Sequence, residues 1–105
     1  MTKNYTLVFD DVILKQLKQA GKNQQIKQII SKIFDKIEEL GPRAGKLLDS
    51  HLFIYAIKMK SPPLRLYYKY NSATSEIYLF EFEMKTSEGK QQRMIEKLKR
   101  KLLKF

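Results

Sequence analysis

The chain has 105 residues and a formal net charge of +10, with 21 basic and 11 acidic side chains. This length fits one domain over residues 1–105. The chain contains no cysteine and a single histidine, His51, which excludes disulfides, thiolate metal sites and histidine clusters. It has neither a membrane-spanning apolar run nor the apolar core of a signal peptide, so we expect a cytoplasmic protein without a membrane partner.

The positive charge is concentrated in two stretches. Residues 41–70 carry a net charge of +5 and residues 84–105 a net charge of +6, whereas residues 1–40 carry only +2. Such concentration predicts a polyanionic partner, most often nucleic acid. A solubilising, lysine-rich surface is the alternative interpretation.

The chain begins with a predicted strand and a first helix. Residues 4–9 are rich in β-branched and aromatic types, which is typical of a strand. Asp10 and Asp11 offer an N-cap and favourable negative charge for a helix that runs to about Ala20. Gly21 is predicted to end this helix in a left-handed turn.

A second helix is indicated by apolar residues at helical spacing from Ile26 to Leu40, and Gly41-Pro42 stops it. Because the break between the two helices is short, we expect an antiparallel helical hairpin. Residues 41–50 are predicted to form a loop that carries Arg43 and Lys46.

Three strands are predicted next, over residues 53–60, 64–70 and 77–85, with turns at 61–63 and 71–75. Side chains alternate between the two faces of a strand. In an antiparallel meander, one face would be apolar, built from Phe53, Tyr55, Ile57, Met59, Leu64, Leu66, Tyr68, Tyr70, Tyr78, Phe80, Phe82 and Met84. The opposite face would collect the polar residues, namely Lys58, Lys60, Arg65, Tyr67, Lys69, Glu81, Glu83 and Lys85.

A basic helix is predicted over residues 89–104, capped by Thr86 or Ser87. Its apolar stripe consists of Met94, Ile95, Leu98, Leu102 and Phe105. The sequence therefore predicts an α+β fold of order β-α-α-β-β-β-α, in which the helical hairpin packs on a small antiparallel sheet.

The cationic face is suited to cleaving RNA. An arginine fork such as that of Arg65 matches phosphate oxygens, and a lysine crowded by cations, such as Lys58 or Lys60, can approach neutrality and accept a proton. Tyr67 on the same face can stack on a base. The alternative is that these residues simply form the solvent-exposed face of a sheet and have no catalytic role. Paired carboxylates at Glu81 and Glu83 more plausibly neutralise neighbouring cations than hold a metal, so no metal site is expected.

The order of the motifs resembles the RelE/ParE toxin superfamily, in particular its HigB-like branch. The resemblance rests on residues 45–48, residues 52–58, the Arg-hydrophobic-x-Tyr pattern within residues 63–68, and residues 77–86 followed by Lys90-Gln91-Gln92. These short motifs together cover nearly the whole chain.

The resemblance implies the toxin of a type II toxin–antitoxin pair that cuts mRNA on the ribosome through attack of a 2′-hydroxyl, without metal or another cofactor. It maps the central-strand arginine of the family to Arg65 and its basic positions to Lys58, Lys60 and Lys85. Arg65 would stabilise the phosphorane and Lys58 would take the 2′-hydroxyl proton. The general acid is unassigned, because residues 86–94 lack the tyrosine that some members have there. RNA contacts are predicted for Tyr67, Lys69, Lys85, Arg93, Lys46 and Arg43.

Two alternatives stay open: a ParE-like inhibitor that binds DNA gyrase, and a non-catalytic relic that binds RNA or the ribosome. The implied protein partner is an antitoxin. Charge complementarity predicts that an acidic or amphipathic antitoxin segment covers the cationic face or displaces the terminal helix.

Overall fold

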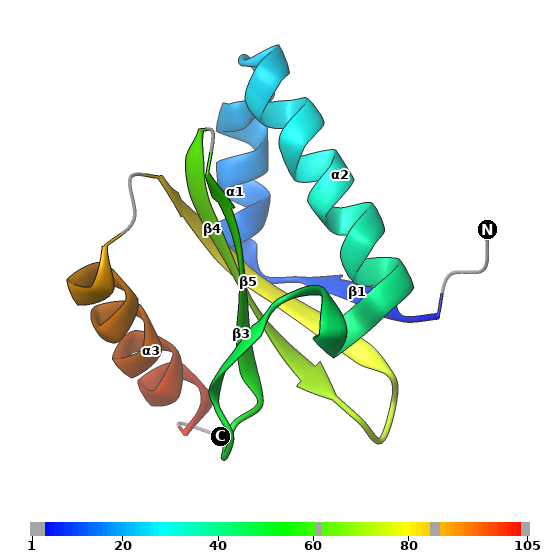
Figure 1. Cartoon of the computed structure of the whole chain (residues 1–105), viewed down its shortest axis with the longest axis vertical. Coiled ribbons are helices and arrows are strands. Elements are labelled where there is room, and N and C mark those ends of the chain that lie inside the picture. Colours follow the sequence, from blue (N-terminus) through cyan, green and yellow to red (C-terminus); the bar gives the residue numbers. More distant parts are fainter. Residues whose placement is uncertain (1–3, 61, 85–86, 104–105) are drawn as a thin grey trace.

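A computed structural model describes residues 4–60, 62–84 and 87–103. Its five strands form one sheet in the order β1-β5-β4-β3-β2, with α1 and α2 on one side and α3 on the other (Figure 1). The elements are β1 (Thr6–Phe9), α1 (Asp11–Ala20), α2 (Gln24–Leu40), the 3-10 turn η1 (Gly41–Ala44), β2 (Lys46–Asp49), β3 (Ile54–Lys60), β4 (Pro63–Asn71), β5 (Glu76–Met84) and α3 (Glu88–Leu102). The predicted α+β class is confirmed, with one additional strand.

Side-chain caps begin both N-terminal helices. The Asp10 carboxylate accepts a hydrogen bond from the Val12 N–H at 2.9 Å, as predicted, and the Asn23 side chain accepts one from Ile26 at 3.2 Å. The left-handed turn predicted at Gly21 is wrong, since its φ is −58°. Its N–H donates to the Leu17 carbonyl at 2.9 Å, so Gly21 keeps the right-handed helical conformation as the C-cap of α1.

Residues 41–50 are not a simple loop. Leu40 is followed by η1 and then by β2, in which Lys46 lies opposite Ala56 of β3 in antiparallel register. Gly41 has a φ of +59°, and a Cβ built there would lie 2.4 Å from the Tyr5 ring, so only glycine fits. The strand was missed because a four-residue edge strand is too short to show alternation, and pairing with β3 decides its conformation.

The sheet is mixed, which corrects the expectation of a purely antiparallel one. β1 runs parallel to β5, with Thr6 opposite Glu76 and Phe9 opposite Leu79, whereas the other neighbouring pairs are antiparallel. β5 continues to Met84, beyond the end of β1. The outer edge of its second half therefore needs other hydrogen-bond partners.

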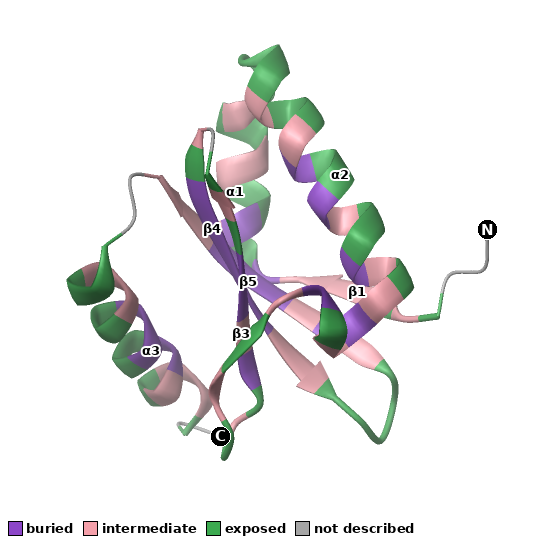
Figure 2. Cartoon of the chain, in the orientation of Figure 1, coloured by how far each residue is buried: buried purple, intermediate pink, exposed green. Residues whose placement is uncertain are grey.

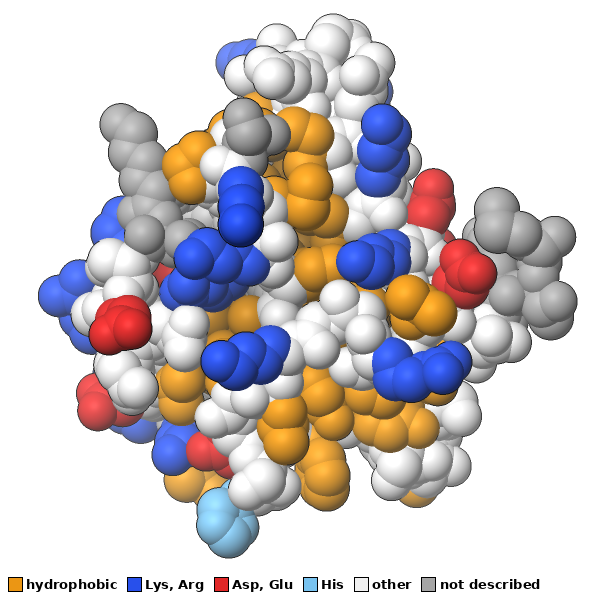
Figure 3. Space-filling model, in the orientation of Figure 1, with side chains coloured by type: hydrophobic (Ala, Val, Ile, Leu, Met, Phe, Trp, Pro, Cys, Tyr) orange, Lys and Arg blue, Asp and Glu red, His pale blue; other side chains and the backbone are white. Residues whose placement is uncertain are grey.

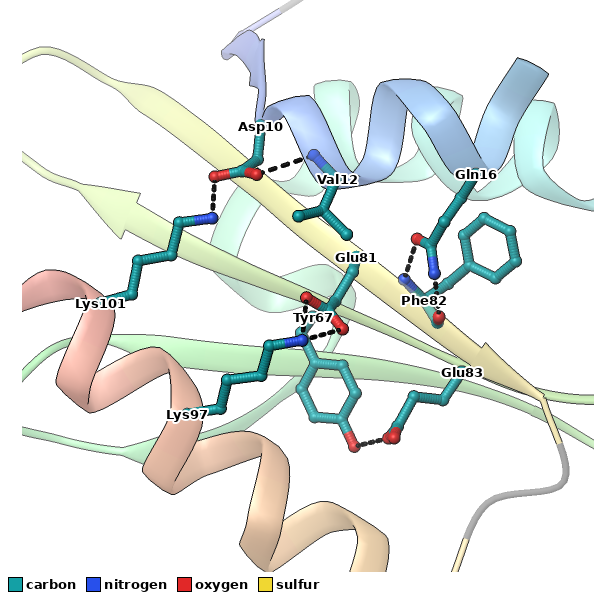
Figure 4. Close-up of polar contacts among 9 residues, drawn as sticks. All are labelled: Asp10, Val12, Gln16, Tyr67, Glu81, Phe82, Glu83, Lys97 and Lys101. Carbon is teal, nitrogen blue, oxygen red and sulfur yellow. Dashed lines mark hydrogen bonds and ion pairs between the residues drawn. The ribbon is translucent and has the colours of Figure 1, made fainter. Parts of the chain in front are cut away.

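Gln16 of α1 hydrogen-bonds to this edge of β5. Its amide donates to the Phe82 carbonyl and accepts from the Phe82 N–H, both at 2.9 Å (Figure 4). We expect Gln16→Ala to lower the free energy of unfolding by about 1–3 kcal/mol, because it leaves a donor and an acceptor of the strand unpaired. Urea denaturation measures this. Gln19→Ala, at an exposed position of the same helix, should change it by less than about 0.5 kcal/mol; equal effects would contradict the prediction.

Strict alternation fails in β5 at Phe80. Tyr67 lies opposite Glu81 while Tyr68 lies opposite Leu79, so Phe80 is the extra residue of a β-bulge. Because of the bulge, Ile77 and Leu79 pack with the cluster under α1 and α2. Tyr78 and Phe80, predicted for that cluster, lie on the α3 side instead. Phe53, also predicted for the apolar face, is exposed. The other predicted members pack under α1 and α2, namely Tyr55, Ile57, Met59, Leu64, Leu66, Tyr68, Tyr70, Phe82 and Met84.

Helix α3 covers much of the face predicted to be polar (Figure 2). Its buried residues Met94 and Leu98 pack with Ile54, Tyr67 and Phe80 of the sheet. Ion pairs add to this contact. Lys97 pairs with Glu81 at 3.0 Å and Lys101 pairs with Asp10 (Figure 4). Lys99 pairs with Asp49 at 2.9 Å. Each of the three carboxylates is at most 9% exposed. The helix therefore leaves only part of the polar face open.

The lowered pKa values of two of these carboxylates predict that the fold loses stability in acid. Burial alone would raise the pKa of Asp10, but hydrogen bonds from Lys101, Val12 and Tyr78 outweigh it and lower the pKa. The Leu52 N–H and Lys99 lower the pKa of Asp49. A carboxyl whose pKa is depressed in the folded state stabilises the fold above its unfolded pKa of about 3.9, and this contribution disappears as pH falls through the folded value.

We therefore expect the melting temperature of the wild type to fall more steeply between about pH 5 and pH 2 than that of Asp10→Asn, which should already be less stable at pH 7. Thermal unfolding followed by circular dichroism across this range measures the difference. Asp11→Asn, at an exposed neighbouring position, is the control and should keep the wild-type slope. Parallel slopes for wild type and Asp10→Asn would refute the assignment.

Candidate functional site

A cavity of about 610 Å³ lies where the start of α3 meets the sheet. Three cations line it, each from a different strand: Lys46 of β2, Lys58 of β3 and Arg65 of β4. The first turns of α3 contribute Glu88, Gly89, Gln91 and Gln92. The cavity therefore joins the two stretches of the chain in which the sequence concentrates positive charge.

The strand register explains why these cations meet. Lys58 lies directly opposite Arg65, and Lys46 lies opposite Ala56, two residues before Lys58. Residues directly opposite one another point to the same face of a sheet, as do residues two apart on one strand. Arg65 is only 7% exposed, whereas Lys58 and Lys46 are exposed. The guanidinium therefore lies deeper than the two ammonium groups.

Arg65 contacts the start of α3 and lies opposite a carboxylate of β5. Its Nη1 donates to the carbonyl of Ser87, the N-cap of α3, at 3.4 Å. Glu83 of β5 lies opposite Arg65 and accepts a hydrogen bond from the Tyr67 hydroxyl at 2.8 Å (Figure 4). Burial raises the pKa of Tyr67 to about 12, and the hydrogen bond to Glu83 acts in the same direction. The Tyr67 hydroxyl thus stays protonated and fixes Glu83 beside Arg65.

The predicted stacking of Tyr67 on a base needs correction, and Lys69, whose RNA contact stays a prediction, lies away from the cavity. Tyr67 is 0% exposed beneath α3, so its ring cannot stack on a base. Lys69 lies on the same face but far along the strand, where its Nζ donates to the Leu52 carbonyl at 2.6 Å. It lines a different cavity, of about 510 Å³, together with Tyr78 and Lys101. Alternation placed these residues on the correct face, but it could not show which part of that face α3 covers.

Three other predicted site residues lie outside the cavity lining. Lys60, Arg43 and Arg93 are exposed, on β3, η1 and α3. Lys85 falls outside the described residues. Their roles as phosphate contacts stay predictions.

The cavity residues Glu88, Gln91 and Gln92 were assigned no role from the sequence. A signal was nevertheless present. Because Arg65 pairs with Glu83 near the end of β5, a helix that begins shortly after this strand has to start beside Arg65. The Ser87 hydroxyl, which accepts from the Lys90 N–H at 3.2 Å, fixes that start.

The electrostatics of the cavity favour an anion. Its cations are joined by the N-terminus of α3, where unpaired N–H groups and the helix dipole attract negative charge. Lysine and arginine also occupy the middle of the face seen in Figure 3, with acidic side chains toward its margins. Within the described ranges, no cluster of three histidine or acidic side chains could hold a metal ion. No helix of that part of the chain is long and apolar enough to cross a membrane.

No protein-family model matches the sequence, and no curated protein matches it significantly. Solved structures do match. A mutant of the Escherichia coli toxin RelE in the free state is 22% identical over 77% of this chain and 83% of its own, with a TM-score of 0.64. A crystal structure of the isolated E. coli RelE toxin is 21% identical over 90% of this chain and 98% of its own, with a TM-score of 0.62.

A chain of the toxin–antitoxin complex RelBE2 from Mycobacterium tuberculosis is 15% identical over 83% of this chain and 98% of its own, with a TM-score of 0.64. These matches cover most of both chains at low identity, and they therefore establish the fold. The resemblance to the RelE toxins seen in the sequence is confirmed for the fold. This chain has the fold of the RelE toxins.

Proposed function

We propose that this chain is the toxin of a type II toxin–antitoxin pair and a ribosome-dependent endoribonuclease that cuts mRNA. The observation that carries the proposal is the convergence of Lys46, Lys58 and Arg65 with the N-terminus of α3 in one cavity. The RelE fold supports it. At about 610 Å³, the cavity is within the range of small-ligand sites and has room for a nucleotide-sized segment.

The proposed reaction is attack of a 2′-hydroxyl on the adjacent phosphodiester. The transition state gathers negative charge on the non-bridging oxygens, and a preorganised cation stabilises it most. Arg65 has this role because it is deep in the cavity and fixed by Ser87. Its planar fork can bind two phosphate oxygens at once, and Lys46 adds charge at the mouth.

We also propose an antitoxin as the protein partner. Solved neighbours of the chain include a RelE mutant bound to a peptide of the antitoxin RelB. An acidic antitoxin segment would complement the cavity and the exposed cations of α3, and its binding should weaken with salt. Deleting α3 would not test this, because the helix covers the apolar residues Ile54, Tyr67 and Phe80. Charge reversal at exposed Arg100 is the cleaner variant.

Translation in vitro with purified protein, followed by mapping of mRNA 5′ ends, tests the proposed activity. We expect new ends within ribosome-bound messages, carrying 5′-hydroxyl groups, and few or none in the same RNA without ribosomes. Inhibited translation with intact mRNA would point instead to a non-catalytic binder. Intact mRNA together with gyrase-dependent DNA breaks would point to a ParE-like inhibitor.

A further inference from the structure

Glu88 is the one carboxylate among the residues described as lining the cationic cavity. Neighbouring carboxylates are engaged: Glu81 with Lys97, Glu83 with Tyr67 and Asp49 with Lys99. The Glu88 side chain is exposed and forms no hydrogen bond or ion pair within the described ranges. A carboxylate so placed is available to a ligand that enters the cavity.

The placement of Glu88 relative to Lys58 suggests two complementary roles. Arg65 neighbours both residues, because it pairs directly with Lys58 across the strands and donates to the carbonyl of Ser87, the residue before Glu88. A phosphoryl group held by Arg65 would thus have a carboxylate toward α3 and an ammonium toward β3. An in-line displacement requires the attacking and leaving oxygens on opposite sides of phosphorus, and two groups from different elements of one cavity can serve the two sides.

We infer that Glu88 takes the 2′-hydroxyl proton and that Lys58 protonates the leaving oxygen, an assignment that rests on the proposed endoribonuclease activity. An ionised carboxylate only accepts hydrogen bonds, and an ammonium only donates them. The role first expected for Lys58, as the base, would require the ammonium to lose its proton beforehand.

In the proposed step, two protons move and one phosphorus–oxygen bond replaces another. The 2′-hydroxyl proton moves to the Glu88 carboxylate as the 2′-oxygen bonds to phosphorus. The bond from phosphorus to the 5′-oxygen breaks, and that oxygen receives a proton from Lys58. The products are a 2′,3′-cyclic phosphate and a 5′-hydroxyl, and solvent returns the proton from Glu88 to Lys58.

A purely structural role for Glu88 predicts different behaviour. An acidic side chain in the first turn stabilises a helix through its dipole, and Glu88 occupies such a position. That role affects the melting temperature but neither the pH dependence of cleavage nor the dependence on the leaving group. These two readouts separate catalysis from helix stabilisation.

The test is single-turnover cleavage of ribosome-bound mRNA. Loss of a general base should slow Glu88→Gln by about 10²–10⁴-fold and remove the rise of the rate with pH on the acid side, while RNA binding stays within about threefold. Glu96→Gln makes the same charge change on an exposed part of α3 outside the cavity and should cleave at the wild-type rate. Melting temperatures of both variants close to that of the wild type would show that the fold is intact.

A substrate with sulfur in place of the scissile 5′-oxygen separates acid from base, because a thiolate leaves without being protonated. Lys58→Arg keeps the charge but cannot give up a proton, so its slow cleavage should be rescued by this substrate. Glu88→Gln should not be rescued. Two results would overturn the assignment but leave the proposed function standing. In the first, the wild type cleaves and Glu88→Gln cleaves equally fast. In the second, the sulfur-containing substrate restores the cleavage rate of Glu88→Gln. A wild-type protein that cuts no ribosome-bound mRNA would overturn the proposed function and the assignment with it.

Discussion

Replacing Arg65 with alanine should lower the single-turnover rate of mRNA cleavage by at least about 10²–10³-fold, the effect of removing one preorganised donor from a charged transition state. Arg65 is the deepest of the three cavity cations and is fixed by Ser87. Arg65→Lys keeps the positive charge but loses the planar fork, so we expect an intermediate rate. Rates are measured on ribosome-bound mRNA with enzyme in excess.

Two controls make the Arg65 experiment decisive. Arg100→Ala removes an exposed arginine of α3 outside the cavity, and we expect it to cleave at close to the wild-type rate. Because Arg65 is nearly buried beside Glu83, circular dichroism and melting temperature should accompany each variant. A folded Arg65→Ala protein that cleaves as fast as the wild type would remove Arg65 from the mechanism.

The largest expected loss of stability follows from Leu66→Ala. Leu66 is 0% exposed at the centre of the sheet, within the cluster that packs under α1 and α2. Truncating a fully buried leucine costs about 2–5 kcal/mol through lost burial and the cavity left behind. For a domain of this size, the melting temperature should fall by roughly 10–25 °C.

Leu47→Ala is the matched control for this truncation. Leu47 lies in the edge strand β2 and is 43% exposed, so the same change of side chain should cost far less there. Guanidinium denaturation of both variants gives the comparison. Similar losses at the two positions would show that the packing around Leu66 is not as tight as the structure has it.

Local features of the sequence were sufficient to predict most helices and strands. The Asp10 cap, the isoleucine stripe of α2 and the Ser87 cap each depend on residues within a few positions of one another, and the structure shows them as predicted. Alternation along β3 and β4 also placed Lys58 and Arg65 on one face, where the register sets them opposite one another. Period and capping are local properties, and a single sequence displays them directly.

Contacts between distant parts of the chain decided the rest. The short β2, the parallel pairing of β1 and the bulge at Phe80 exist only because of their partner strands. Tyr67 shows the same limit at the site, since alternation cannot tell which polar residues a helix will cover.

The sequence by itself determined that cations would gather on one face of a small sheet and that Arg65 would be among them. The tertiary structure alone decided where α3 lies. Helix α3 covers Tyr67 and brings Glu88 to the same cavity as Lys58 and Arg65. The candidate site is therefore one cavity that also contains a carboxylate, and not the whole cationic face. The physical reason is that α3 must bury Met94 and Leu98 against the sheet, and that packing fixes where its first turn lies.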